Sequence, residues 1–268
     1  MRKAFTLIEV LVVICIITLL LSIALPAFTS AREGTRTLVC KSNLHQLLLA
    51  NISYASENDG FFVPAASDMM DSPGLNRWHG TRNTLNEPFD SQKGPLSGYL
   101  ANAQVKECPL KVSFVRDHDW NTNYEQGCGG YGYNMTYIGS RLWQTGLITE
   151  RDWLNAYAKT TRIEEIRMPA QTLVFSDTAM GNDGDSLIEY SFAEPPFAVK
   201  NGLPVASFYM SPSIHFRHNS NSNIGWADGH ISHSKIAQFD SVNVYEVNSA
   251  DLYLGWFNPI DNSLFDLK

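Results

Sequence analysis

The chain has one long apolar run near its N-terminus, followed by a remainder in which apolar and polar positions are mixed. The run from Phe5 to Leu25 contains a single charged residue, Glu9. At about 1.5 Å of rise per residue, a helix of this length spans the roughly 30 Å hydrocarbon core of a membrane. The run therefore predicts a transmembrane helix over residues 5–25, and Arg2 and Lys3 before it predict a cytoplasmic N-terminus.

The helical pattern continues beyond the apolar run as an amphipathic segment. Pro26 cannot donate a helical hydrogen bond, so we expect a bend there. Farther along, apolar positions recur every three or four residues, at Cys40, Leu44, Leu48, Ile52 and Ala55. The turn-forming stretch ENDG at 57–60 ends this pattern, which predicts one helix over residues 5–57.

Residues 58–268 are expected to form an α+β domain built on an antiparallel sheet. Short aromatic and β-branched stretches alternate there with Gly, Pro, Asn and Asp, which is the pattern of strands joined by turns. The predicted strands lie at 61–64, 131–138, 172–177, 205–210, 223–227 and 230–236. Short helices are predicted at 95–102 and 149–158.

The last two predicted strands are separated by Asp228 and Gly229. An Asp-Gly pair between two such strands is the strongest short-range signal for a two-residue type I′ turn. The sequence therefore predicts a hairpin within residues 218–236.

Composition and charge limit the classes of function. The chain has 268 residues, 44% hydrophobic, which is enough for a large packed core. Its net charge is −7, and no basic cluster follows Lys3. A nucleic-acid partner is therefore not predicted.

An acid within an apolar run needs an explanation, because a carboxylate in a span costs roughly 2–3 kcal/mol on insertion scales. A secretory signal has a shorter apolar region and carries no acid. A plain signal anchor fits the length but leaves Glu9 uncompensated. A buried core helix is disfavoured by the length of the uninterrupted run.

The stretch KAFTLIEVLVVICIITLLLSIALP at 3–26 resembles the N-terminus of type IV prepilins and of the pseudopilins of type II secretion systems. The resemblance implies that residues 1–4 are a leader, removed between Ala4 and Phe5, and that the new amino group is methylated. Phe5, Glu9 and Pro26 match the family's positions, and Ala4 stands where the family usually has Gly.

The same resemblance implies partners and a location. Prepilin peptidase would process the precursor in the bacterial inner membrane, where lipid surrounds it before assembly. An inner-membrane assembly platform would then add the subunit to a helical filament of identical chains, other pilins or pseudopilins, in the periplasm or on the cell surface. In the filament, Glu9 of one subunit would pair with the Phe5 amine of its neighbour and set the register.

A second resemblance lies near the C-terminus. His218 precedes Asp228 by ten residues in HNSNSNIGWADGH, and this H-x9-DG spacing is similar to a motif of a large group of prepilin-like proteins. His218, Asp228 and Gly229 match that motif. The resemblance gives the domain no biochemical role.

The cysteines show no C-x-x-C pair, which argues against a zinc ribbon. In an oxidising compartment Cys108 and Cys128 can form a disulfide, worth roughly 3 kcal/mol. The alternative is that both are small buried apolar side chains.

Two acid or histidine clusters can bind a metal, although a solvated loop and a folding turn are the preferred interpretations. His218, Asp228, His230 and His233, with Asp177, offer ligands for a transition ion. Asp177, Asn182, Asp183 and Asp185 offer oxygens for Ca²⁺ but do not follow the EF-hand pattern. No cofactor is predicted.

No nucleophile elbow, HExxH helix, P-loop or dinucleotide fingerprint is present, so an enzyme is not predicted. The interpretation that fits best is a structural filament subunit, either a pilin or a major or minor pseudopilin. The alternative is a membrane-anchored periplasmic binding protein or metal-dependent enzyme that keeps a prepilin-type signal.

Overall fold

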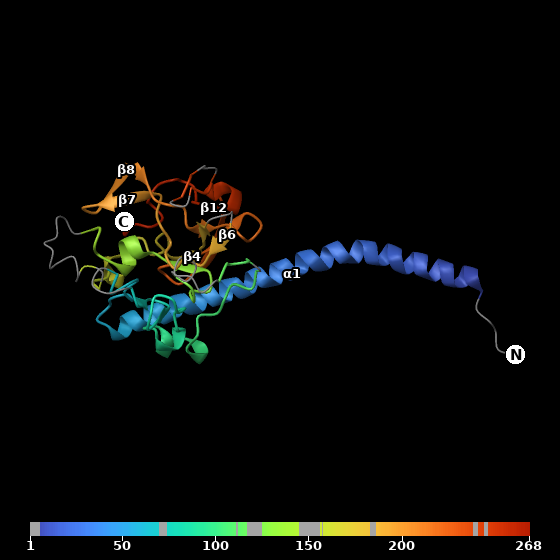
Figure 1. Ribbon diagram of the computed structural model, residues 1–268, viewed down its shortest axis with the longest axis horizontal. Helices are drawn as coiled ribbons and strands as arrows, with labels where there is room; N and C mark the ends of the chain where they lie inside the picture. The colour runs from blue at the N-terminus through green and yellow to red at the C-terminus, as the bar shows by residue number, and fades with distance from the viewer. Residues whose placement is uncertain are drawn as a thin grey trace.

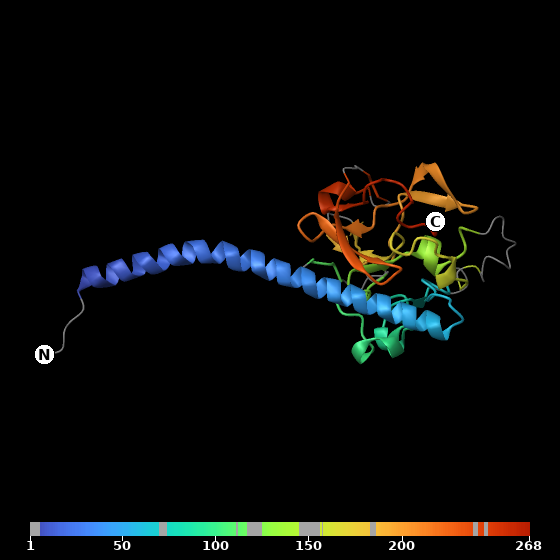
Figure 2. The same ribbon diagram turned by 180° about the vertical axis from the view of Figure 1, so that it is seen from behind.

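A computed structural model describes residues 6–69, 74–110, 112–116, 125–144, 156, 158–182, 186–237, 241–243 and 246–268. One long helix, α1, projects from a domain made of short strands and turns (Figure 1). Its C-terminal part runs along the domain, and its N-terminal part extends away from it in both views (Figures 1 and 2). This arrangement confirms the predicted α+β class.

Helix α1 runs from Leu7 to Glu57 and includes Pro26. The expected bend does not interrupt the helix, which is continuous and gently curved (Figure 1). The predicted stop is confirmed, because the backbone N–H of Gly60 bonds to the Ala55 carbonyl at 2.9 Å, with Gly60 at a φ of +82°. A left-handed glycine just after the last turn is a common way to end a helix.

The amphipathic second half of α1 packs as its periodicity predicts. Cys40, Leu44, Leu48 and Ala55 are buried, and Ile52 is partly buried against the core. Cys40 is the first buried residue along the described part of the helix. The domain thus contacts α1 from Thr37, whose hydroxyl lies 3.1 Å from His218 Nδ1, and buries its side chains from Cys40 onward.

The main sheet has four antiparallel strands in the order β11-β10-β4-β3. They are β3 (Tyr131–Tyr133), β4 (Leu173–Asp177), β10 (Asn221–Trp226) and β11 (Ile231–Lys235). Helix α1 lies against β10 and β4. Close approach depends on Gly225 of β10, where a Cβ atom would lie 2.8 Å from Leu48 Cδ1.

Smaller antiparallel pairs surround the main sheet. They are β1 (Asn76–Arg77) with β2 (Gly80–Thr81), β5 (Met180–Asn182) with β6 (Ser186–Ile188), β7 (Phe197–Lys200) with β8 (Leu203–Tyr209), and β9 (Ile214–His215) with β12 (Leu254–Gly255). The predicted strand at 61–64 is reduced to a single bridge between Phe61 and Arg162.

The strand predicted at 131–138 is wrong in its second half. It ends at Tyr133, and a single π-helical turn, η4 (Met135–Gly139), follows. Asn134 causes the change, because its side chain accepts a hydrogen bond from the Tyr137 N–H and donates to the Leu173 and Phe265 carbonyls. A polar side chain that competes for backbone partners favours a cap over a strand.

Five further segments of the described residues are single 3₁₀ turns: η1 (Ser91–Lys93), η2 (Ser97–Tyr99), η3 (Ala101–Ala103), η5 (Ile163–Glu165) and η6 (Ser249–Leu252). The helix predicted at 95–102 is thus two short turns, η2 and the start of η3. The one predicted at 149–158 lies outside the described residues, apart from Ala156 and Ala158.

The predicted hairpin is present as β10 and β11, but its turn is not type I′. The loop has three residues, because Trp226 N–H bonds to the His230 carbonyl and Gly229 N–H bonds back to the Trp226 carbonyl. Gly229 has a positive φ of +95°, whereas Asp228 does not, as type I′ would require. The loop is held from outside the hairpin, because Asp228 N–H bonds to the Pro169 carbonyl.

Candidate functional site

The N-terminal end of α1 gives Glu9 partners within its own chain. Its carboxylate accepts hydrogen bonds from the Thr6 backbone N–H and hydroxyl, both at 2.8 Å. The Thr6 hydroxyl in turn accepts from the Glu9 N–H at 3.3 Å. This is a capping box, and its signature, Thr-x-x-Glu before an apolar run, was available in the sequence but was not used in the prediction. Ala4 and Phe5 lie outside the described residues.

The first half of α1 presents an almost uninterrupted apolar surface. Large side chains such as Leu7, Ile8 and Phe28 are 82%, 72% and 72% exposed. α1 is long and apolar enough to cross a membrane, with a mean hydropathy of 3.0 over its most apolar window and none of that window buried. Such a surface requires lipid or neighbouring apolar helices around it.

A second feature lies where α1 enters the domain. Four side chains with metal-binding atoms meet there: Cys40 of α1, Cys108 of the segment before β3, Asp177 at the end of β4, and His218 between β9 and β10. One sulfur, nitrogen or oxygen atom from each lies within 4.8 Å of the others. All four residues are buried, and none is more than 8% exposed.

Hydrogen bonds connect the members of this Cys–Cys–Asp–His cluster. The Cys40 thiol donates to Asp177 Oδ1 at 3.2 Å, and His218 Nε2 lies 3.2 Å from Asp177 Oδ2 and 3.7 Å from Cys108 Sγ. Further contacts come from its surroundings. Thr37 Oγ1 lies 3.1 Å from His218 Nδ1. The Tyr131 hydroxyl and Asn223 Nδ2 each donate to Cys40 Sγ at 3.3 Å. The Asn223 backbone N–H donates to Asp177 Oδ2 at 2.9 Å.

The electrostatics of the cluster favour the ionised forms of Asp177, His218 and Cys108. Burial alone would raise the pKa of Asp177, but the hydrogen bond from His218 and the charge of Arg217 hold it below its ordinary value. Burial opposes protonation of His218, yet hydrogen bonds to Asp177 and Cys108 raise the pKa of His218 to about 9. The hydrogen bond from Cys40 lowers the pKa of Cys108 to about 6, while burial raises that of Cys40. Cys108 can therefore supply a thiolate at neutral pH.

The structure separates the metal candidates that the sequence grouped together. Asp177 and His218 meet in the cluster, whereas Asp228 and His230 pair with each other at 2.6 Å in the exposed hairpin loop. His233 contacts Lys41 instead. Of the calcium candidates, Asn182 ends β5, and Asp183 and Asp185 lie outside the described residues.

Sequence reasoning missed both cysteines of the cluster, because it considered Cys108 only as a disulfide partner of Cys128 or as a small buried apolar side chain. In the structure both are free thiols, so the suggested disulfide is absent from it. The Cys108 sulfur faces His218 and Cys40 rather than Cys128. The available signal was the position of Cys40 on the predicted buried face of the helix.

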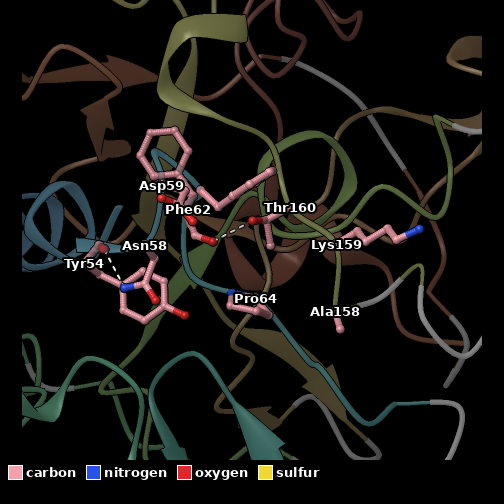
Figure 3. Close-up of a pocket in the computed structure, with 9 residues that line it drawn as sticks. Tyr54, Asn58, Asp59, Phe62, Pro64, Ala158, Lys159 and Thr160 are labelled. Atoms are coloured by element: carbon pink, nitrogen blue, oxygen red, sulfur yellow. Dashed lines mark hydrogen bonds between the residues drawn. The ribbon is translucent and has the colours of Figure 1, made fainter. Parts of the chain in front are cut away.

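A third feature is a hollow of about 340 Å³ near the C-terminal end of α1 (Figure 3). Its lining includes Tyr54, Asn58, Phe62, Lys159 and Thr160. Two polar groups of the lining bond to backbone carbonyls of other lining residues. The Thr160 hydroxyl donates to the Phe62 carbonyl, and the Asn58 amide donates to the Tyr54 carbonyl. Lys159 points away from the other labelled side chains (Figure 3). The lining therefore offers no convergent set of catalytic groups.

Comparisons with known proteins bear on the helix. The model of the prokaryotic N-terminal methylation motif matches residues 1–25. The chain is also 28% identical over 110 residues to the type IV major pilin protein PilA of Myxococcus xanthus (strain DK1622). That alignment covers 41% of this chain and 41% of PilA, so the chain matches about two fifths of its curated relative's length. No solved structure matches the chain. The chain thus carries a prepilin-type N-terminal methylation motif and is similar, over part of its length, to a type IV major pilin.

Proposed function

We propose that this chain is a structural subunit of a type IV pilus-like filament, made as a membrane-anchored precursor and assembled through the first half of α1. The observation that carries the proposal is the exposed apolar surface of α1, most of which lies within the matched methylation motif. At about 1.5 Å of rise per residue, residues 7–25 cover roughly 29 Å, enough to cross the bilayer before assembly. In a filament the same surface would pack against neighbouring copies.

Processing would precede assembly. Prepilin peptidase would cleave between Ala4 and Phe5, and the new amine would be methylated. The carboxylate of Glu9 would then form an ion pair with the Phe5 amine of a neighbouring subunit, in addition to its hydrogen bonds with Thr6 of its own chain. A charge pair in an apolar bundle favours one register, because any slip leaves both charges unpaired.

The enzyme alternative is less well supported. A catalytic metal site keeps one coordination position open to substrate. All four residues of the Cys–Cys–Asp–His cluster are instead buried, Cys40 and Asp177 completely. The hollow beside α1 lacks a matching set of charged groups. A structural role therefore fits the described residues better.

Shearing separates a filament subunit from an anchored protein. Cells that produce the chain are sheared, filaments are sedimented, and the mass of the intact subunit is measured. We expect the chain in the sedimented fraction, beginning at a methylated Phe5. Loss of Arg2 and Lys3 changes the formal side-chain charge from 20 − 27 = −7 to 18 − 27 = −9. A chain that stays with the membrane and still begins at Met1 would contradict the proposal.

A further inference from the structure

We propose that Cys40, Cys108, Asp177 and His218 bind one zinc ion, which fastens α1 to the sheet where the helix enters the domain. This inference concerns the fold of the subunit and does not depend on filament assembly. Its starting point is that four donor atoms from four separate segments lie within 4.8 Å of one another in the buried interior. No local secondary structure requires these residue types to meet.

The donor set fits zinc. Two cysteine sulfurs, an imidazole nitrogen and a carboxylate oxygen are ligands that Zn²⁺ takes in tetrahedral structural sites. Bond lengths of about 2.0–2.3 Å place the corners of such a tetrahedron about 3.3–3.8 Å apart. Cys40 Sγ lies 3.2 Å from Asp177 Oδ1, and His218 Nε2 lies 3.2 Å from Asp177 Oδ2 and 3.7 Å from Cys108 Sγ, so the donor atoms are spaced nearly as such edges are. Because Cys40 and His218 contact different oxygens of Asp177, the carboxylate would turn to present one oxygen to the ion.

The groups around the cluster orient the ligands as outer contacts do in metal sites. Thr37 binds His218 Nδ1, which leaves Nε2 facing the other ligands. Asn223 contacts two of them, through its backbone N–H to Asp177 and its side chain to Cys40. Such contacts fix the direction of a ligand before the ion arrives, and they raise affinity.

The charge of the site also balances. Zinc would displace the protons of Cys40 and His218, and the resulting two thiolates, one carboxylate and neutral imidazole around Zn²⁺ leave one net negative charge. Arg217 lies beside the cluster, with its guanidinium bonded to the carbonyls of Gly130 and Thr178, and its positive charge acts on both Asp177 and Cys108. A nearby cation lowers the cost of burying an anionic metal centre.

The position gives the ion a mechanical role. Cys40 is the first buried residue along the described part of α1, and the other ligands come from the segment before β3, the end of β4 and the segment before β10. One ion would therefore tie the helix to three parts of the domain. Because every ligand comes from the protein, the site is of the closed, structural kind.

The test measures metal in the full chain, purified in detergent under reducing conditions without chelator. Elemental analysis should find one zinc ion per chain. Replacement of zinc by Co²⁺ should produce sulfur-to-cobalt charge-transfer absorption and the strong visible bands of tetrahedral coordination. Cys108→Ser should lose both signals, whereas Cys128→Ser, which removes a buried thiol outside the cluster, should keep both.

Three results would overturn the proposal. One is folded wild-type chain that has reduced thiols and takes up neither zinc nor Co²⁺. Another is a Cys40–Cys108 disulfide found by peptide mapping of chain purified without reductant from its native host, because an oxidised pair cannot supply two thiolates. The third is a Cys108→Ser chain that binds zinc as the wild type does. The wild-type measurements decide the matter even where a variant fails to fold.

Discussion

The two halves of α1 use the same backbone geometry under opposite conditions. From Leu7 to Val39 no described residue is buried, and the surface is almost wholly apolar as far as Phe28. From Cys40 to Glu57 one face is buried in the domain, and that face includes polar side chains such as Asn43 and Asn51. The first half therefore depends on surroundings that other molecules must supply, whereas the second half is completed by its own chain.

Polar groups in the two halves show the same contrast. Among the described residues, the polar contacts of Glu9 are with Thr6, at the start of its own helix. In the second half, Asn51 Oδ1 accepts the backbone N–H of Val63 at 3.0 Å, and Asn43 donates to the Glu107 carbonyl at 3.1 Å. Mutations in the first half should therefore affect assembly, and mutations in the second half should affect folding.

The largest expected effect is on assembly, from Glu9. Glu9→Ala should insert into the membrane at least as well as the wild type, because a carboxylate in a span is costly. Filaments should be lost, because the neighbour's Phe5 amine would be left unpaired at a cost of roughly 3–5 kcal/mol per subunit. Sedimentation of sheared filaments measures the outcome, and the domain should unfold at an unchanged temperature.

Glu9→Gln is the matched control for this prediction. Gln can serve at this position of a capping box as well as Glu, so the variant keeps the cap and removes only the charge. We expect Glu9→Gln to fail in assembly as Glu9→Ala does. Correctly cleaved Glu9→Gln subunits that form filaments of normal number and length would show that Glu9 caps the helix and does not set the register between subunits.

The second prediction concerns the buried half of α1. Leu48 is 1% exposed and its neighbour Leu49 is 47% exposed, so the two differ in burial and little else. Leu48→Ala should lower the free energy of unfolding by about 2–5 kcal/mol, as large-to-small changes in a core do. Leu49→Ala should change it by only about 0.5 kcal/mol. Denaturant unfolding of the two full-length variants in detergent measures these losses. Equal losses of unfolding free energy in the two variants would contradict the prediction.

The accuracy of the sequence-based predictions follows the same division. The end of α1 and its buried face were predicted correctly, because a period of three to four residues and the turn residues at 57–60 are local signals. The hairpin at Asp228 was also predicted, since the Asp-Gly pair is local. Its three-residue loop was not, because contacts with the Pro169 and Thr172 carbonyls help to decide the conformation.

The Cys–Cys–Asp–His cluster could be predicted only in part. Asp177 and His218 were selected because their residue types suit a metal. Cys40 and Cys108 were not, because they are 68 positions apart and meet only after α1 has packed on the sheet. For Cys108 and Cys128 the sequence left a disulfide or two buried thiols open, and in the structure both are buried free thiols.

The third prediction concerns the pH dependence of the domain's stability, which Glu194 should govern in part. Burial raises the pKa of Glu194 to about 6, against the weaker effect of hydrogen bonds from Tyr190 and Thr136. A shift of this size corresponds to about 2 kcal/mol. Because the folded-state pKa is raised, the charged Glu194 carboxylate destabilises the domain fully above about pH 6. This destabilisation disappears as the pH falls below the unfolded-state pKa near 4.5.

Glu194→Gln should therefore stabilise the domain by up to about 2 kcal/mol at pH 7, and the gain should vanish near pH 4.5. Denaturant unfolding of both chains across this range measures the difference. Thr136→Ser keeps a hydroxyl beside the carboxylate, and this control should leave the pH dependence of the wild type in place. An increase in stability from Glu194→Gln that does not change with pH would contradict a raised pKa of the buried Glu194 carboxyl.

The smallest expected effect lies in the exposed half, at Gly34. A Cβ atom added there would meet nothing within 4 Å, and the residue lies within regular helix. Gly34→Ala should therefore stabilise the helix locally by about 1 kcal/mol, because alanine loses less backbone freedom than glycine in a helix. The domain should unfold as before, since Gly34 precedes the first buried residue of α1.

Hydrogen exchange measures this local effect, because amides open with the free energy of their own segment. Amides around Gly34 should exchange about fivefold more slowly in Gly34→Ala, as a gain of about 1 kcal/mol requires. Gly225→Ala is the contrasting control, because its Cβ would lie 2.8 Å from Leu48 Cδ1 and should destabilise the packing of α1 on β10 by about 1–3 kcal/mol. Unchanged exchange around Gly34, or a Gly34→Ala gain that extends to the domain core, would contradict the independence of the two halves of α1.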